Sequence, residues 1–598
     1  MIAGSRFATA AALAAFITAS AVAVNGAQTW KRVDTPNFVI IGPASESHLQ
    51  SLGVQFEGFR EALTRLLSST ATTTAVPTVV IEFSDAKTFK PFQPVYNGKP
   101  VPIGGLFVPR RHVNYVLLAP DRGPDSLRMV FHEYSHLVVS NVAPLIPVWL
   151  NEGIAEYYSA FRLESSGRKV TIGWPIESHL VRLQEATWLP LADLLATAHD
   201  SPQYNEGSPR SVFYSEAWAL VHMLLHGDPK FRTAFSAYAR DVSLGVAPDE
   251  AWRQQFGSED VLNDVRRYIR RPTLQAVQYE LSEQIARASG VPQSMTDVDV
   301  DLTLGEVLVA EGKPDAASLR FDRAVAAAPF SLRGAVDRGL LRSDRQLLTL
   351  PATPAPVADW LADYMTAAAL LEGGASDEAT LTVAREALAR CLAVRPDIPN
   401  AQVLYASAID DDTKAVEALR KALAAAPARD DYALDLARAL AQQHDYAAAR
   451  DVLGRVIARP HHPDAREQAF SMMRQVVKAE ENAKAAAGAV RPSGTSGPRG
   501  SNVRYIYRDL KPGEQRAEGT LERIDCAGRR VTVSVHVGDK VAHYQAPSFD
   551  AIQFLTYRDD LNGNIGCGAR TPPDRVYVTW IAGDLDGTVV ALEFLPKK

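Results

Sequence analysis

The sequence places two histidines and a glutamate at a spacing that can build a metal site. His132, Glu133 and His136 form an H-E-x-x-H motif. Residues four apart on an α-helix lie one turn apart on the same face, so both imidazoles can reach one ion at about 2.0–2.1 Å. Glu133 is rotated by about 100° from His132, which suits removal of a proton from water better than metal binding. The motif therefore predicts a zinc site that activates water.

A catalytic zinc site needs a third protein ligand and one position left open for water. Glu152 and Glu156 lie four residues apart, after a short connection bounded by Pro144 and Pro147. From one helical face, either carboxylate could reach the ion. The alternative for the whole motif is an amphipathic helix whose histidines only satisfy polar groups of the core.

Two consecutive helices must carry these residues. Asp125 supplies N-cap chemistry for a helix that reaches about Asn141, beyond which the prolines prevent its continuation. A second helix begins near Pro147, and residues 149–161 and 214–226 keep a helical apolar stripe. The upstream sequence predicts a small α/β lobe, from β-rich runs at residues 37–42, 78–83 and 113–119 and from helical apolar spacing at residues 49–67.

These motifs resemble those of the gluzincins, the clan of thermolysin and the zinc aminopeptidases, and most closely their exported peptidase MA-like branch. In that clan the glutamate of an Asn-Glu pair on the next helix is the third metal ligand, and Asn151-Glu152 matches this pair. Glu156 falls where thermolysin-like members keep an acid that accepts a hydrogen bond from a ligand histidine. The resemblance covers residues 28–275 and implies an α+β peptidase lobe. It implies one Zn²⁺ per chain, held by His132, His136 and Glu152, with Glu133 as the general base.

Tyr214 resembles the tyrosine that many gluzincins place on a later helix, where its hydroxyl donates a hydrogen bond to the developing oxyanion. The alternative is an aromatic residue of the core. The chain lacks the Gly-x-Met-Glu-Asn segment of the zinc aminopeptidases, and residues 104–107 (GGLF) occupy the corresponding region. Exopeptidase action is therefore unsupported, and the choice between endo- and exo-cleavage stays open. The strand around these glycines could pair with an extended peptide by β-augmentation.

A second histidine pair, His222 and His226, also has helical spacing. No carboxylate lies between these two residues to activate water. His226 precedes Gly227, a predicted helix C-cap, and a histidine there interacts favourably with the helix dipole. We expect no metal at this pair.

Beyond about residue 290 the sequence turns to Ala, Leu, Arg and Asp, with few β-branched residues. Ala-rich helices end at Pro329, Pro396, Pro427 and Pro460, which are separated by 67, 31 and 33 residues. A period of this length indicates stacked helical hairpins, and residues 430–459 resemble a tetratricopeptide repeat (TPR). Such an array would present a protein partner or the substrate. The alternative is an irregular helical bundle without a groove.

Composition and the N-terminal segment restrict the class of protein. A net charge of -6 gives no attraction for phosphate backbones, so we expect no nucleic acid partner. Residues 1–27 contain Arg6, an apolar run and then small residues that suit a cleavage site, as is typical of a secretory signal peptide. The alternative is an uncleaved membrane anchor. No second stretch of spanning length follows, so we expect no membrane span after signal removal and a periplasmic or secreted protein.

Three cysteines, Cys391, Cys526 and Cys567, are too few for a disulfide scaffold or a thiolate zinc cluster. In an oxidising compartment Cys526 and Cys567 could pair while Cys391 stays buried and free. The alternative is three reduced thiols.

A chain of 598 residues is expected to form several domains. We expect an exported zinc metallopeptidase that hydrolyses peptide bonds of a protein or peptide substrate. The alternative is a periplasmic TPR scaffold whose peptidase-like lobe is catalytically silent. The predicted parts are a signal peptide at 1–27, a gluzincin-like α+β lobe at 28–275, an all-α TPR-like array at 276–480, a flexible linker at 481–502 and a small all-β domain at 503–598.

Overall fold

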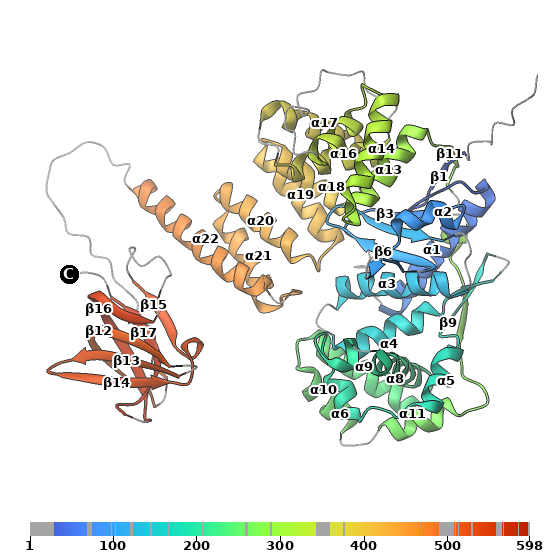
Figure 1. Ribbon diagram of the computed structural model, residues 1–598. Helices are drawn as coiled ribbons and strands as arrows, with labels where there is room; N and C mark the ends of the chain where they lie inside the picture. The colour runs from blue at the N-terminus through green and yellow to red at the C-terminus, as the bar shows by residue number, and fades with distance from the viewer. Residues whose placement is uncertain are drawn as a thin grey trace, which may run out of the picture. The chain divides into compact units, whose positions relative to one another are not determined.

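The computed structural model describes most of residues 29–595. Its gaps fall at residues 68–73, 97–98, 102, 120–123, 144–145, 165–166, 206, 258–260, 287–289, 342–358, 375–376, 463, 489–507, 509, 512, 528–529, 558–564, 566 and 584. The chain divides into two compact units, Met1–Val490 and Arg491–Lys598, and each is described by itself (Figure 1). The predicted signal peptide lies outside the described residues. Within them, no helix is both long and apolar enough to cross a membrane.

A six-stranded sheet organises the first unit, with strand order β11-β1-β2-β3-β7-β6. The three β-rich runs of the sequence form its centre. β2 (Phe38–Gly42), β3 (Thr78–Glu82) and β7 (Asn114–Leu118) pair in parallel and are buried on both faces, as central parallel strands are. β6 (Gly105–Pro109) pairs antiparallel with β7, and β1 (Lys31–Asp34) and β11 (Gln293–Ser294) extend the sheet beyond β2.

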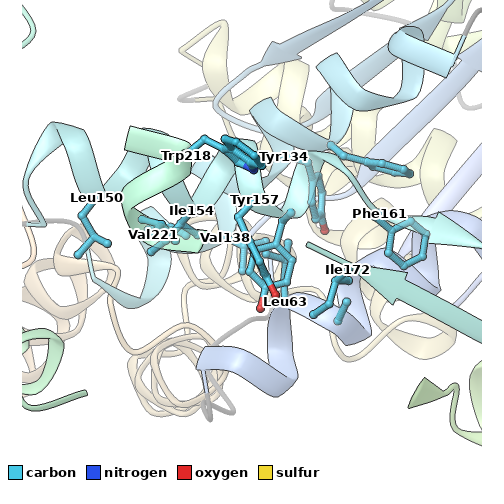
Figure 2. Packing of buried hydrophobic residues seen from close by; sticks show 14 of the residues in the cluster. Leu63, Tyr134, Val138, Leu150, Ile154, Tyr157, Phe161, Ile172, Trp218 and Val221 are labelled. Atoms are coloured by element: carbon cyan, nitrogen blue, oxygen red, sulfur yellow. The ribbon is translucent and has the colours of Figure 1, made fainter. Parts of the chain in front are cut away.

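Helices cover one face of this sheet and carry the histidine motif. α1 (Glu46–Leu67) connects β2 to β3, and α3 (Pro124–Val142) packs against β6. α4 (Val148–Ser159) packs against both α3 and α8 (Gly207–His226). Large buried side chains fill the space between these helices, among them Tyr134, Tyr157 and Trp218 (Figure 2).

Gly153 allows α4 and α8 to approach each other closely. A Cβ atom at this position would lie 2.5 Å from the carbonyl oxygen of Ala217 and 2.6 Å from Cγ2 of Val221. The lack of a side chain therefore sets the position of α4, including its neighbouring residue Glu152.

The remaining elements of this part are α2 (Ala86–Phe89), β4 (Val95–Tyr96), β5 (Lys99–Pro100), β8 (Arg162–Leu163), β9 (Lys169–Ile172), α5 (Glu177–Glu185), α6 (Leu191–Ala196), α7 (Pro202–Asn205), α9 (Pro229–Ser243), α10 (Pro248–Phe256), α11 (Val261–Ile269), β10 (Val277–Glu280) and α12 (Glu283–Ala286).

Further helices share a core with the opposite face of the sheet. Side chains of β2, β3 and β7 on this face, including Tyr115, pack in one cluster with α13 to α18. Arg32 on β1 donates to both carboxylate oxygens of Asp359 at 2.8 Å, and Tyr364 donates to the carbonyl of His112 at 2.6 Å. These helices are α13 (Asp297–Ala310), α14 (Pro314–Ala327), α15 (Leu332–Leu341), α16 (Trp360–Glu372), α17 (Glu378–Val394) and α18 (Pro399–Ala408), followed by α19 (Asp412–Ala425), α20 (Asp430–Gln442), α21 (Tyr446–Ala458) and α22 (Ala465–Gly488).

This part of the chain is a helical-repeat region, because consecutive helices pack in pairs: α13 with α14, α16 with α17, α18 with α19 and α20 with α21. The helix α22 corrects the predicted start of the linker, since residues 481–488 are helical. The linker was predicted from the loss of apolar periodicity, but alanine, glutamate and lysine favour a helix without any apolar stripe. The rest of the predicted linker lies outside the described residues.

The second unit is a β domain with strand order β14-β13-β12-β16-β17-β15. A further pairing between β14 and β17 closes five of these strands around an apolar core. Cys526 and Cys567 form a disulfide in this unit, whereas Cys391 is buried and free in the first. The strands are β12 (Gln515–Ala527), β13 (Arg530–Val537), β14 (Lys540–Ala546), β15 (Gln553–Thr556), β16 (Gly568–Ile581) and β17 (Thr588–Phe594).

Candidate metal centre

His132 and His136 on α3 converge with Glu152 on α4. The two Nε2 atoms lie 3.1 Å apart, and each lies 3.2 Å from Oε2 of Glu152. Three corners of a zinc tetrahedron with bonds of about 2.0–2.1 Å are separated by about 3.3–3.4 Å. The three donor atoms therefore match the size of a zinc site. Among the described residues, this is the one group of three His, Cys, Asp or Glu side chains with ligand atoms within 4.8 Å of one another.

The outer nitrogens of both histidines face oxygen acceptors. Nδ1 of His136 lies 3.1 Å from Oδ1 of Asn151, and Nδ1 of His132 lies 3.4 Å from Oε1 of Glu156. An acceptor at Nδ1 favours the tautomer that carries its proton there, which leaves the lone pair on Nε2. Both lone pairs are therefore available at the side where Glu152 lies.

Glu152 is buried and its two oxygens have different surroundings. Oε1 accepts a hydrogen bond of 2.9 Å from the hydroxyl of Tyr204. Oε2 is buried without a well-formed hydrogen bond, and its neighbours are the two histidine nitrogens. Three lone-pair donors at this separation repel one another unless a proton or a cation lies between them. The donor set thus fits a divalent cation.

The ionisation of this cluster also favours the binding of a cation. Burial opposes the charge on Glu152, but the contacts with His132 and His136 outweigh burial and lower the pKa of this carboxyl to about 2. Burial also opposes the charge on His136, yet bonding to Glu152 raises its pKa. The carboxylate is therefore ionised, and the cluster attracts positive charge.

The cluster lies in a cleft of about 910 Å³. Glu133 is exposed and lines this cleft, as the predicted general base must. Tyr214 on α8 also lines it, and the ring of Tyr214 lies 6.1 Å from that of His132. The structure thus brings all six predicted residues, which are His132, Glu133, His136, Glu152, Glu156 and Tyr214, to a single cleft.

Glu156 belongs to a wider network than the sequence indicated. Its Oε2 accepts hydrogen bonds of 3.1 Å from Arg128 and from Nε2 of His179, and Nδ1 of His179 lies 2.9 Å from the hydroxyl of Ser215. Burial opposes the charge on Glu156, but these cationic and hydrogen-bonding neighbours lower its pKa to about 2. Its contact with His132, at 3.4 Å, is the longest of these. The ionised Glu156 therefore links one histidine of the cluster to α5 and α8.

Sequence reasoning missed Tyr204, His179 and Arg128. These residues lie on α7, α5 and α3, and Tyr204 and His179 are separated from the motif by long stretches of chain. No periodic spacing connects them to the histidines, so only the folded chain identifies them. Arg128 lies one helical turn before His132, a position that gives a common helix face but no indication of a partner.

The second histidine pair makes hydrogen bonds within the core. His222 is buried, with Nδ1 2.8 Å from the hydroxyl of Tyr268 and Nε2 2.9 Å from the carbonyl of Gly173. Nε2 of His226 lies 2.8 Å from the hydroxyl of Tyr157. Both residues act as hydrogen-bonded histidines of the core.

A scan against protein families and a search of curated proteins find no match to this chain. Solved structures similar to parts of it are helical-repeat proteins. MamA 41-end from Desulfovibrio magneticus RS-1 has a TM-score of 0.22 at 16% identity and covers 28% of this chain and 98% of its own. The TPR domain of P58(IPK) has a TM-score of 0.17 at 15% identity and covers 33% of this chain and 68% of its own. Similarity at this level says nothing about activity.

Proposed function

We propose that this chain is a zinc-dependent peptidase. The observation that supports the proposal is the triangle of His132 Nε2, His136 Nε2 and Glu152 Oε2, with sides of 3.1–3.2 Å, in an open cleft. When bound, Zn²⁺ supplies a Lewis acid and lowers the pKa of a water ligand toward about 7.

Each remaining role falls to a residue of the cleft. Glu133 takes the proton of the attacking water and passes it to the leaving amine. The hydroxyl of Tyr214 donates a hydrogen bond to the oxyanion. Asn151 and Glu156 hold the outer nitrogens of the ligand histidines, and Tyr204 holds the ligand carboxylate.

The substrate is a protein or peptide in extended form. α3 packs against β6, which is the terminal strand in the order of the sheet. A peptide that adds to this edge as a further strand would run beside the helix that carries both histidines. Export to the periplasm or the medium is supported by the apolar segment at 1–27 and by the disulfide in the β domain.

The test combines metal analysis with digestion of an unfolded protein such as carboxymethylated lactalbumin. The wild-type chain is expected to hold about one zinc and to cleave this substrate. Glu133→Gln should keep the zinc and lose activity by about 10² or more, because only the base is removed. His132→Ala should lose the metal. Glu185→Gln, at an exposed position on α5, is the matched control.

A second candidate is a protein-interaction scaffold with a catalytically silent lobe. The paired helices from α13 to α21, and the repeat fold of the similar solved structures, favour this function. It predicts a wild-type chain that retains zinc, cleaves no unfolded protein and binds a partner through the repeats. A chain that holds no zinc after purification in its presence contradicts the first proposal outright.

A further inference from the structure

A second cavity, of about 870 Å³, lies on the face of the sheet opposite the metal cleft. The turn between β6 and β7 forms one side, and α13, α15 and α16 form the others. It shares no lining residue with the metal cleft. Its walls are apolar and include Val309, Leu340, Met365 and Ala368.

A carboxyl group with one unpaired oxygen lies among the residues that line this cavity. Asp337 on α15 is only 9% exposed, and its Oδ2 atom is buried with no hydrogen-bond partner. The neighbouring Glu306 is satisfied, because it accepts a hydrogen bond of 3.2 Å from Tyr115 and one of 2.8 Å from Arg333. Two carboxyl groups, those of Glu306 and Asp337, therefore line the cavity, and the guanidinium of Arg333, which pairs with Glu306, is not among the lining residues.

This imbalance has an energetic consequence. Burial and the nearby Glu306, which shares a hydrogen bond with Asp337, raise the pKa of Asp337, and the attraction of Arg333 opposes them only in part. A buried polar atom without a partner is energetically unfavourable. A cationic group placed against Asp337 would supply the missing donor and balance the second carboxylate.

Basic side chains line the rim of the cavity. Arg110 and Arg111 line it and are exposed, and the exposed Glu372 also lines it, with Oε2 3.9 Å from Nε2 of His112. Two guanidiniums and one carboxylate therefore line the rim, while Glu311 and Asp435 attract Arg110 and Arg111 from outside the lining. The cavity thus has an acidic end, apolar walls and a basic mouth.

We propose that this cavity binds a basic amino acid with a free carboxylate, as free arginine or lysine or as the C-terminal residue of a peptide. The cationic head donates to Asp337, the aliphatic stem packs against Leu340 and Met365, and the carboxylate pairs with Arg110 and Arg111. A guanidinium fits best, since it offers five donors in a rigid plane. This site is independent of the proposed zinc chemistry.

Isothermal titration of the full chain with matched ligands tests the assignment. L-arginine should bind, and citrulline, which has the same shape without the charge, should bind at least tenfold more weakly. Agmatine, which lacks the carboxylate, should also bind at least tenfold more weakly. A peptide that ends in arginine, compared with its C-terminal amide, distinguishes the two sources: tighter binding than free arginine indicates a peptide end, and no binding indicates the free amino acid.

Two variants locate the binding to this cavity. Asp337→Asn should weaken arginine binding at least tenfold with little change in the melting temperature, because the amide can keep the hydrogen bond to Glu306 but cannot become negatively charged. Arg111→Ala should weaken arginine but not agmatine. Asp315→Asn, at an exposed position on α14, is the control. Equal binding of arginine and citrulline, an unchanged affinity in Asp337→Asn, or no binding of arginine in either form overturns the proposal.

Discussion

The hydroxyl of Tyr204 donates a hydrogen bond of 2.9 Å to Oε1 of Glu152. This contact engages one oxygen of the carboxylate and leaves Oε2 beside the two histidine nitrogens. Tyr204 also stacks on Tyr214, with ring centroids 6.0 Å apart. One residue of the short helix α7 therefore orients both a candidate ligand and the candidate oxyanion donor.

Replacing Tyr204 by phenylalanine should weaken zinc binding without unfolding the chain. Loss of a hydrogen bond to a ligand typically reduces metal affinity by about 10–100-fold. Competition with a chromophoric chelator measures this change. Tyr446→Phe, whose hydroxyl lies 2.8 Å from Nδ1 of His444 in the repeats, should leave zinc affinity unchanged. Equal affinity in Tyr204→Phe and wild type would show that this contact does not position Glu152.

Gly153→Ala should destabilise the first unit. The new methyl group would lie 2.5 Å from the carbonyl of Ala217, so α4 and α8 must separate. Overpacking of this kind costs about 1–3 kcal/mol and would also displace Glu152. Urea unfolding measures the free energy of unfolding, and zinc titration measures the loss of affinity that follows from the displacement of Glu152. The control is Gly454→Ala on α21, where a Cβ would meet no described atom within 4 Å apart from the adjacent backbone of its own helix, and it should stabilise by about 0.5–1 kcal/mol.

His222 should make the fold sensitive to acid. Burial lowers the pKa of His222 to about 4, whereas an unfolded chain has a histidine pKa of about 6.5. The unfolded state therefore takes up the proton first as the pH falls. Stability should decrease between about pH 6.5 and 4, by up to about 3 kcal/mol from this residue. The pH dependence of urea unfolding should be flatter in His222→Gln, but unchanged in His199→Gln, which alters an exposed histidine.

Removal of the Cys526–Cys567 disulfide should destabilise the β domain alone. The two residues are separated by 41 positions, and opening a loop of this length costs about 4 kcal/mol in the chain-entropy description. Hydrogen exchange of the double serine variant should rise in β12 to β17 and stay unchanged in β1 to α22. Faster exchange across both units would indicate that their stabilities are coupled. Cys391→Ser, at a buried free thiol, separates loss of the bond from loss of a cysteine.

Much of the candidate site follows from local sequence, because helix geometry is local. The spacing of His132 and His136 places both imidazoles on one face of α3 whatever surrounds the helix. Pro147 and the apolar stripe after it place Glu152 and Glu156 on the next helix. The resemblance to gluzincins identified Glu152 as the third ligand. In the structure, Oε2 of Glu152 lies beside the Nε2 atoms of His132 and His136.

Only the tertiary structure identifies the partners that come from distant parts of the chain. Tyr204 and His179 reach the cleft because α7 and α5 pack against α8, and no spacing in the sequence encodes that contact. The cavity at Asp337 forms because α13, α15 and α16 meet the β6–β7 turn, about 200 residues away in sequence. Periodicity determines which side of a helix a residue occupies, whereas the identity of the neighbour depends on the packing of whole elements.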